Sequence, residues 1–231
     1  MVSNEIISNV ISFVFGAMSL LIALTLKDWF ARIDDKRKKR NARQSKSMDY
    51  AKKMYHFIQQ LQFRLKDLRS RDEVRDVNKL PDKTTSIEWY TKNGYFMTST
   101  VYLFAAVSCL INRFRRNPDF VEFGKYSEHE ELRLCIEQYN QCISTNTVMW
   151  YHYHIAIGDS VFEDNSVISF YRFINKLSND REYFAFINQA FQFISQLYAD
   201  VVLLDSLIIN LEGILSHIRQ KILNSDDFKQ V

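Results

Sequence analysis

The chain contains little glycine and proline, with five Gly and two Pro among 231 residues. Proline removes a backbone donor and interrupts helices, while glycine supplies the positive φ angles of tight turns. A chain with so few of both is expected to form a small number of long helices. The 18 Phe and 12 Tyr are sufficient for a well-filled core, which argues against disorder over most of the length. The sequence therefore predicts an all-α fold.

Cysteine is also scarce, and the three present, Cys109, Cys135 and Cys142, form no CxxC pair. An odd number without paired spacing argues against a disulfide framework and against a zinc site. We interpret all three as buried, reduced thiols. No Asn-x-Ser/Thr glycosylation acceptor occurs, which is consistent with a cytosolic location for most of the chain.

The recognised catalytic motifs are absent: there is no HExxH, Walker loop, dinucleotide fingerprint or nucleophile elbow. His152 and His154 are two residues apart, so a helix would point them in different directions. Asp200 and Asp205 interrupt an apolar helix, and we interpret them as solvated or paired residues rather than catalytic acids. We therefore expect no catalytic, metal or cofactor site and interpret the chain as a non-enzymatic protein.

Charge is missing from one long stretch, residues 6–26, with the sequence IISNVISFVFGAMSLLIALTL. Its length matches the roughly 20 residues that a helix needs to cross the hydrocarbon core. Its twelve Leu, Ile, Val and Phe residues favour insertion by roughly 4 to 7 kcal/mol. A cleaved signal peptide is the rival interpretation, but such peptides begin with basic residues and have a shorter apolar stretch. We predict a transmembrane anchor over residues 1–27.

A basic juxtamembrane segment follows over residues 28–46. From Lys27 to Lys46 nine basic and three acidic residues give a net charge of +6, whereas the whole chain carries +3. Basic flanks are retained on the cytoplasmic side, which predicts a single-pass protein with its N-terminus outside. Trp29 is expected to lie at the membrane interface. The cations expected to contact anionic lipid headgroups are Lys36, Arg37, Lys38, Lys39, Arg40 and Arg43; nucleic acid is the less favoured partner.

The predicted anchor has one side of small and polar residues. At 100° per residue, six positions fall inside an arc of about 100°. This small-residue face consists of Ser8, Asn9, Ser12, Gly16, Ser19 and Ala23. Contact with lipid alone does not explain why such residues lie on one side of the helix. Packing against a second helix explains it, because small residues let the backbones approach, and so does a water-lined lumen, which suits polar side chains. We expect a homo-oligomer that associates through this face; a single anchor with accidental patterning is the alternative.

Residues 93–112 form a second uncharged stretch, NGYFMTSTVYLFAAVSCLIN. It contains only seven Leu, Ile, Val or Phe residues among several hydroxyls. If it crossed back outward, Arg113, Arg115 and Arg116 would lie outside, against the positive-inside tendency. A buried core helix is therefore the favoured interpretation over a second membrane segment.

Residues 47–231 are predicted to form a cytoplasmic helical bundle with long helices. The helix over residues 47–68 is expected to continue from the anchor, because neither Gly nor Pro occurs between Gly16 and Pro81. Two capping boxes are expected to open later helices: Thr85 with Glu88, whose helix should end before Pro118, and Ser127 with Glu130. Residues 70–83 are expected to form a loop, and residues 158–166 a connection.

The most regular pattern lies near the C-terminus, where apolar residues alternate steps of four and three. The seam consists of Tyr183, Ile187, Ala190, Ile194, Leu197, Val201, Leu204, Ile208, Leu211, Leu215, Ile218 and Ile222. Phe186, Phe193, Leu207 and Ile214 widen the stripe, which is typical of a helix inside a bundle. We expect one central helix of an intramolecular bundle here; a parallel two-stranded coiled coil is the alternative.

The layout of one N-terminal span, a basic run and a helical bundle resembles the membrane accessory proteins encoded beside some RNA-targeting CRISPR nucleases. That resemblance implies a divergent HEPN-like bundle and assembly into ring-shaped pores in the bacterial inner membrane. The HEPN ribonuclease signature, an Arg followed after four to six residues by His, is absent, so ribonuclease activity is not implied. The segments STVYLFAAVSCLINRFRR and HIAIGDSVFEDNSVISFYRF are similar to stretches of uncharacterised bacterial helical proteins.

Three functions remain open. The favoured one is a non-enzymatic inner-membrane protein whose anchors associate into an oligomeric pore or effector, in antiviral defence by the resemblance, controlled by the cytoplasmic bundle. The second is a membrane-tethered adaptor that recruits a cytoplasmic protein or nucleic acid. The third is an unrecognised enzyme acting on RNA.

Overall fold

The computed structural model describes residues 2–70, 80–82, 84–116, 126–145 and 147–223, and it omits the side chains of residues 2–17, 19–25, 44 and 126–129. The chain divides into two compact units, Met1–Lys46 and Ser47–Val231.

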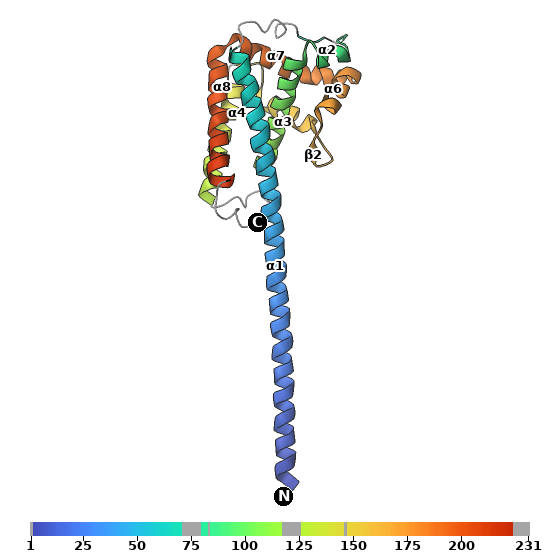
Figure 1. Cartoon of the computed structure of the whole chain (residues 1–231), viewed down its shortest axis with the longest axis vertical. Coiled ribbons are helices and arrows are strands. Elements are labelled where there is room, and N and C mark those ends of the chain that lie inside the picture. Colours follow the sequence, from blue (N-terminus) through green and yellow to red (C-terminus); the bar gives the residue numbers. More distant parts are fainter. Residues whose placement is uncertain (1, 71–79, 83, 117–125, 146, 224–231) are drawn as a thin grey trace. The chain divides into compact units, whose positions relative to one another are not determined.

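Helix α1 (Val2–Ser70) is continuous over 69 residues. The expected continuation of the N-terminal helix into residues 47–68 is therefore confirmed. In the first unit, every side chain from Leu26 to Arg43 is exposed. In the second unit the helix has a buried face of Ala51, Met54, Ile58, Leu61, Leu65 and Leu68. The blue to cyan ribbon in Figure 1 follows this helix.

The regular secondary structure in the described part of the second unit is helical apart from one small hairpin, which confirms the all-α class (Figure 1). After α1 come α2 (Ile87–Thr91), α3 (Tyr95–Arg116), α4 (Tyr126–Ser144), α5 (Tyr151–Ser160), β1 (Phe162–Glu163), β2 (Ser166–Val167), α6 (Phe170–Asn179), α7 (Arg181–Ala199), α8 (Val201–His217) and the π-helical turn η2 (Ile218–Leu223). Strands β1 and β2 pair antiparallel.

Helix α3 is the centre of the core, and sixteen of its 22 residues are buried. Three of its buried hydroxyls, those of Thr98, Thr100 and Ser108, donate to carbonyl oxygens of the preceding turn. These internal hydrogen bonds satisfy the hydroxyls without any partner from another helix. The expectation of a buried core helix over residues 93–112 is therefore confirmed.

Among the described residues, two helices are long and apolar enough to cross a membrane: Tyr95–Arg116 and Val201–Leu223. The most apolar window of the first is 83% buried inside the fold, and that of the second 39%. Burial by protein explains the composition of α3. Within the apolar stretch over residues 6–26 only the side chains of Met18 and Leu26 are described, so the single N-terminal span stays a prediction.

Helices α3 and α5 approach each other closely at Gly158. A Cβ atom at Gly158 would lie 2.6 Å from the backbone nitrogen of Cys109 and 2.7 Å from the carbonyl carbon of Ser108. Those neighbours are backbone atoms, which cannot rotate away. At Gly213, on an exposed turn of α8, an added Cβ would meet no atom within 4 Å. The two glycines therefore differ in what an added methyl group would meet.

We expect Gly158→Ala to lower the free energy of unfolding by about 1–3 kcal/mol, because α3 and α5 must separate. Gly213→Ala is the matched control and should raise it by about 0.5–1 kcal/mol, because alanine favours the helix. Thermal unfolding of the full-length protein in detergent, followed by circular dichroism at 222 nm, measures both. A Gly158→Ala melting temperature at or above that of the wild type would contradict the close approach.

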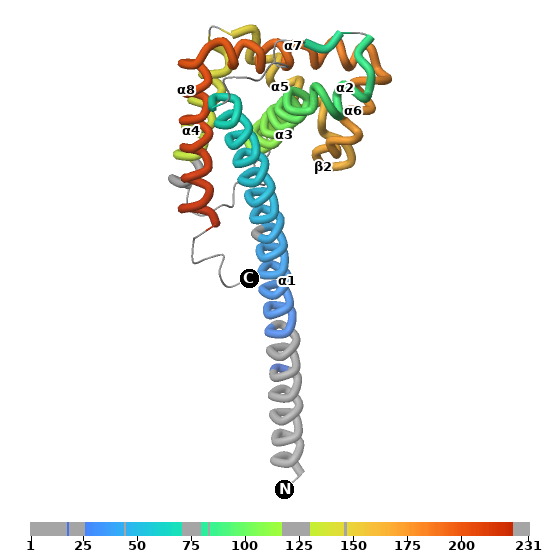
Figure 2. The backbone as a smooth tube through the Cα atoms, turned by 45° about the horizontal axis from the view of Figure 1, so that its top comes forward, coloured from blue at the N-terminus to red at the C-terminus, as the bar shows by residue number. Residues whose placement is uncertain are grey.

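The heptad seam does not form one central helix, which corrects the expectation from the sequence. The chain breaks at Asp200, which ends α7 and caps α8 by accepting a hydrogen bond from the Leu203 backbone N–H at 3.0 Å. Figure 2 shows α7 running across the end of the pair formed by α4 and α8. The intramolecular bundle itself is confirmed, since Ile187, Ile194 and most other seam residues are buried.

Removal of the cap tests the break. Asp200→Ala should lower the free energy of unfolding by about 1 kcal/mol, whereas Asp200→Asn keeps a capping oxygen and should stay close to the wild type. The midpoint of urea unfolding of the detergent-solubilised chain measures the difference. A more stable Asp200→Ala variant would indicate that a continuous helix is preferred.

Two further expectations need correction. The N-cap of α2 is Ser86 rather than Thr85, since the Ser86 hydroxyl accepts from the Trp89 backbone N–H. This helix also stops at Thr91, so α2 and α3 are separate. The expected connection over residues 158–166 contains the end of α5 and most of the hairpin. The second capping box begins at Ser127, whose side chain lies outside the described residues.

Candidate functional site

The predicted self-association surface can be placed only as backbone. Ser8, Asn9, Ser12, Gly16, Ser19 and Ala23 belong to α1, but their side chains lie outside the described residues. The helical backbone is the geometry that the predicted small-residue face requires. Whether that face contacts protein, water or lipid stays a prediction.

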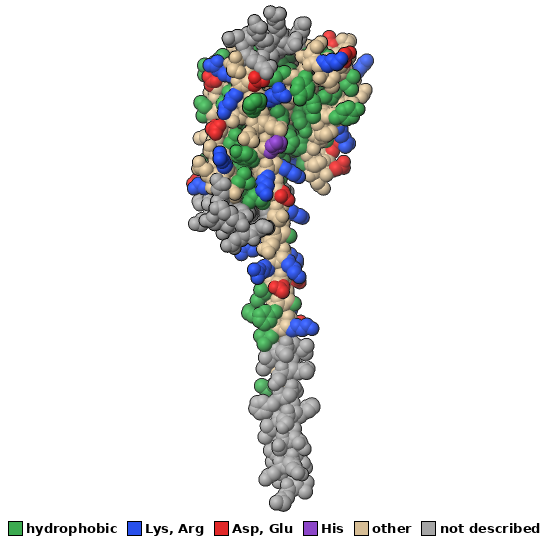
Figure 3. Space-filling model, viewed as in Figure 1, with side chains coloured by type: hydrophobic (Ala, Val, Ile, Leu, Met, Phe, Trp, Pro, Cys, Tyr) green, Lys and Arg blue, Asp and Glu red, His purple; other side chains and the backbone are tan. Residues whose placement is uncertain are grey.

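An apolar stripe follows on the described part of α1. Leu26, Trp29, Phe30 and Ile33 have the spacing i, i+3, i+4 and i+7, so they share one helix face. All four are exposed, and the Trp29 and Phe30 rings meet edge to face with centroids 5.1 Å apart. Figure 3 shows this green patch on α1. Trp29, the predicted interfacial residue, thus belongs to an apolar surface that the first unit leaves uncovered.

The predicted headgroup-binding cations come next along the same helix, where Figure 3 shows blue side chains. They are Lys36, Arg37, Lys38, Lys39 and Arg40, with Arg43 one turn further, and all are exposed. Consecutive helical residues are 100° apart, so five in a row surround the helix. We call these five residues the cationic ring. Such a ring suits an anionic surface and opposes close contact with a second copy at the same level.

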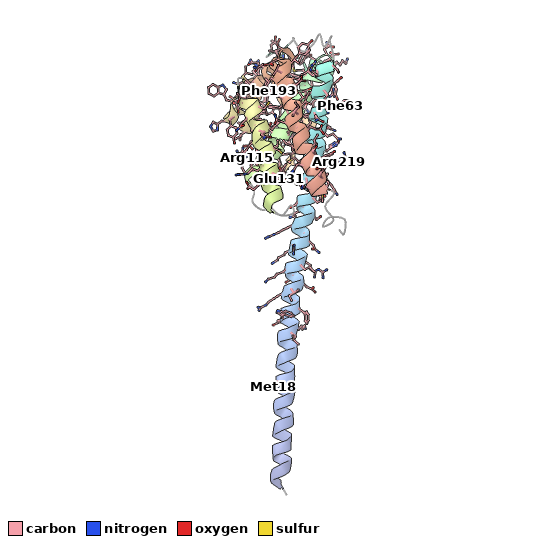
Figure 4. All side chains as sticks on the ribbon, turned by 90° about the vertical axis from the view of Figure 1, so that its left-hand side faces the viewer. Met18, Phe63, Arg115, Glu131, Phe193 and Arg219 are labelled. Atoms are coloured by element: carbon pink, nitrogen blue, oxygen red, sulfur yellow. The ribbon has the colours of Figure 1, made fainter. Side chains whose placement is uncertain are left out.

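The second unit has a groove of about 750 Å³ between α1, α3 and the start of α6. Phe63 lies on its wall and is 69% exposed; Figure 4 labels it. The Arg64 guanidinium lies 5.5 Å from the centroid of Tyr95 and 5.2 Å from that of Phe96. These aromatic rings and one cation suit an apolar or aromatic side chain of a partner. Phe63 lies off the buried face of α1. A large aromatic residue outside the apolar stripe of a helix is the sequence signal that could have indicated this groove.

A poorly satisfied polar cluster lies in the core. His154 on α5 is buried, and its ring lies 6.0 Å from that of Tyr139 on α4. The His154 Nε2, the Tyr139 hydroxyl and the side-chain amide of Asn140 have no hydrogen-bond partner among the described residues. Burial, helped by the positive charge of Arg115, lowers the pKa of His154 from 6.5 to about 3. His154 is therefore a neutral core residue at pH 7.

The other described histidines do not gather into a site. His152 is exposed, so the expectation that it points away from His154 is confirmed. His56 lies in the groove with its Nε2 2.9 Å from the Gln60 amide nitrogen. His217 lies 3.7 Å from Glu131, at the end of the bundle where Figure 4 also labels Arg219. Among the described residues, no three His, Cys, Asp or Glu side chains are placed to hold a metal ion.

Comparison of the chain with protein-family models, with curated proteins and with solved structures gives no match.

The buried His154 predicts a pH dependence of stability. Its folded pKa lies below the unfolded one, so between pH 6.5 and 3 the unfolded chain binds a proton that the folded chain does not. The free energy of unfolding should therefore fall as the pH drops below 6.5, by up to about 1.4 kcal/mol per pH unit from this group.

We expect His154→Gln to flatten the fall in urea midpoint between pH 7 and pH 5, because the titrating imidazole is gone. His152→Gln, at the exposed position two residues away, is the control and should retain the wild-type slope. Parallel profiles for the wild type and His154→Gln would show that His154 does not titrate as described.

Proposed function

We propose that the chain is a single-pass membrane protein that self-associates through its anchor and acts as an oligomeric pore or effector under the control of the helical bundle. The order of features along α1 supports this proposal most strongly. One unbroken helix carries, in sequence, an uncharged stretch of 21 residues, the exposed apolar stripe and the cationic ring. Apolar core, aromatic interface and basic cytoplasmic flank follow one another in this order in a transmembrane helix.

The cationic ring makes the proposed assembly dependent on negative charge. Helices in contact lie roughly 8–10 Å apart, which is about the Debye length at physiological salt. Rings on neighbouring copies would therefore repel each other unless anionic lipid or another anion lies between them. An inner leaflet containing acidic lipid supplies that charge. Assembly in the membrane is thus favoured over assembly of the same helices in neutral detergent.

The resemblance to CRISPR accessory membrane proteins suggests antiviral defence as the setting for this assembly. The bulk of the chain would lie in the cytoplasm of a bacterium, where the bundle receives the signal. No catalytic group takes part in this proposal, which requires only a change in how the anchors associate.

Leucine substitutions on the small-residue face test the assembly. Ser12→Leu with Gly16→Leu should lower the oligomer mass measured by light scattering in detergent containing acidic lipid, because bulky side chains keep the backbones apart. Val10→Leu with Val14→Leu is the control, with the same four-residue spacing on the opposite side of the helix. An unchanged mass for the first pair, or an equal loss for both, would contradict association through this face.

The groove beside Phe63 favours the adaptor as a second candidate function. A large aromatic side chain that is 69% exposed beside a groove is typical of a contact for a protein partner. In this alternative the anchor only tethers the chain, and the bundle recruits a cytoplasmic protein that inserts an apolar or aromatic side chain.

The adaptor predicts that one surface residue controls capture of the partner. Phe63→Ser in the full-length chain should lose proteins that co-purify from its native membranes. Ile209→Ser, at a position on α8 that is 70% exposed, should keep them. Mass spectrometry of the purified material compares the two variants with the wild type. A partner kept by both variants would show that the groove does not recruit it.

A further inference from the structure

A second, smaller pocket lies where α1 and α3 meet the hairpin. It has a volume of about 360 Å³ and is separate from the groove beside Phe63, sharing none of its described lining residues. Its walls include two cations, Lys53 from α1 and Arg113 from α3. No carboxylate occurs among its described lining residues. The pocket is therefore positively charged.

Arg113 is held in place but incompletely hydrogen-bonded. Its guanidinium carbon lies 3.1 Å from the centroid of the Phe162 ring, so the ring supports the flat face of the side chain. Its Nε is buried and has no hydrogen-bond partner among the described residues. A buried charged donor without an acceptor is costly, and a ligand oxygen would remove that cost.

Described acids of α5 and of the hairpin already have other cationic partners. Asp159 accepts from Arg116 at 2.9 Å. Glu163, next to Phe162 in the hairpin, pairs with both Lys176 and Arg172 of α6. Because these carboxylates are engaged elsewhere, they do not neutralise the pocket, and its positive charge remains available to a ligand.

The hairpin places two further polar groups at the pocket in a fixed position. Asn165, with φ of 61°, and Asp164, with φ of 49°, form the tight turn, and Ser166 pairs with Glu163 across the strands. The hairpin is tied to the core because the Tyr102 hydroxyl donates to the carbonyl oxygen of Ile168 at 2.7 Å. Asn165 and Ser166 thus line a pre-organised pocket, as binding sites usually require.

We infer that this pocket binds a phosphate monoester with a small apolar or aromatic body. Lys53 and Arg113 together carry two positive charges, and a phosphate monoester carries about −1.5 to −2 at pH 7. A guanidinium is suited to bind two phosphate oxygens at once. Phe57, on the wall beside them, provides apolar surface for the rest of the ligand. The small volume favours a ligand no larger than a mononucleotide. The inference does not depend on the proposed membrane function.

Calorimetric titration of the full-length protein in detergent tests the site. Phenyl phosphate should bind saturably, and benzoate, which offers the same ring with a single negative charge, should bind at least about tenfold more weakly. Lys53→Gln should weaken phenyl phosphate binding about tenfold or more. Lys52→Gln, at the neighbouring exposed position outside the pocket, and Lys38→Gln, in the cationic ring, should leave the dissociation constant unchanged.

Arg113→Gln should remove binding. Arg113 is half-buried, so if this variant does not fold, the Lys53→Gln variant at the exposed position decides the outcome. Adenosine monophosphate and dioctanoyl phosphatidic acid distinguish the source of the phosphate. Competition by the first identifies a soluble ester, and competition by the second identifies a lipid headgroup. Equal binding of phenyl phosphate to the wild type and Lys53→Gln, or equal loss with Lys38→Gln, would overturn the site. The site would also be overturned if none of the three phosphate compounds bound saturably.

Discussion

Burial of α3 is the constraint on which the described fold of the second unit depends. Helices α2, α5, α6 and α7 all pack against it. The hydroxyl of Tyr50, on α1, donates a hydrogen bond to the carbonyl oxygen of Leu110 on α3. A helix that is covered on nearly every side must carry no charge within the covered part and must satisfy its own hydroxyls, as Thr98 and Ser108 do. A helix that packs closely against it must also present a small residue at the contact, which is why Gly158 of α5 faces the α3 backbone at Ser108 and Cys109. The same composition makes α3 resemble a membrane span, and the surrounding protein takes the place of lipid.

In the first unit the corresponding constraint is electrostatic. Two surfaces of that unit are exposed: the apolar stripe of Leu26, Trp29, Phe30 and Ile33, and the cationic ring after it. The described residues of the unit therefore cover neither surface. An interface between hydrocarbon and anionic headgroups satisfies both surfaces, since aromatic rings prefer the headgroup level and cations the charged surface beyond it. In the proposed assembly, copies that approach through the anchor would also bring their cationic rings close together, and these rings repel each other. Under that proposal, the acidic lipid content of the membrane would take part in controlling assembly.

The predictions from the sequence were correct where a pattern of residues is compatible with only one structure. The continuous α1 follows from the lack of helix-breaking residues between Gly16 and Pro81, and the intramolecular bundle follows from a stripe too wide for a two-stranded coil. The prediction of one central helix failed at Asp200, because the apolar seam continues through that residue and an aspartate costs a helix interior little by its propensity alone. The predicted N-cap, Thr85, was one residue away from the observed one, Ser86, because threonine and serine are both common N-cap residues. The groove and the phosphate pocket were not found, since Lys53, Arg113 and Asn165 are far apart in sequence and carry no shared motif.

The amino-acid sequence by itself determined the all-α class, the unbroken N-terminal helix and the position of the uncharged core helix, because hydrophobic periodicity and the scarcity of Gly and Pro act locally. Only the tertiary structure decided that α7 and α8 turn at Asp200, that Gly158 lies against the α3 backbone, and that two cations from different helices line one pocket. Those features depend on which helices become neighbours. That choice is made by the packing of whole faces against each other, which no short segment encodes.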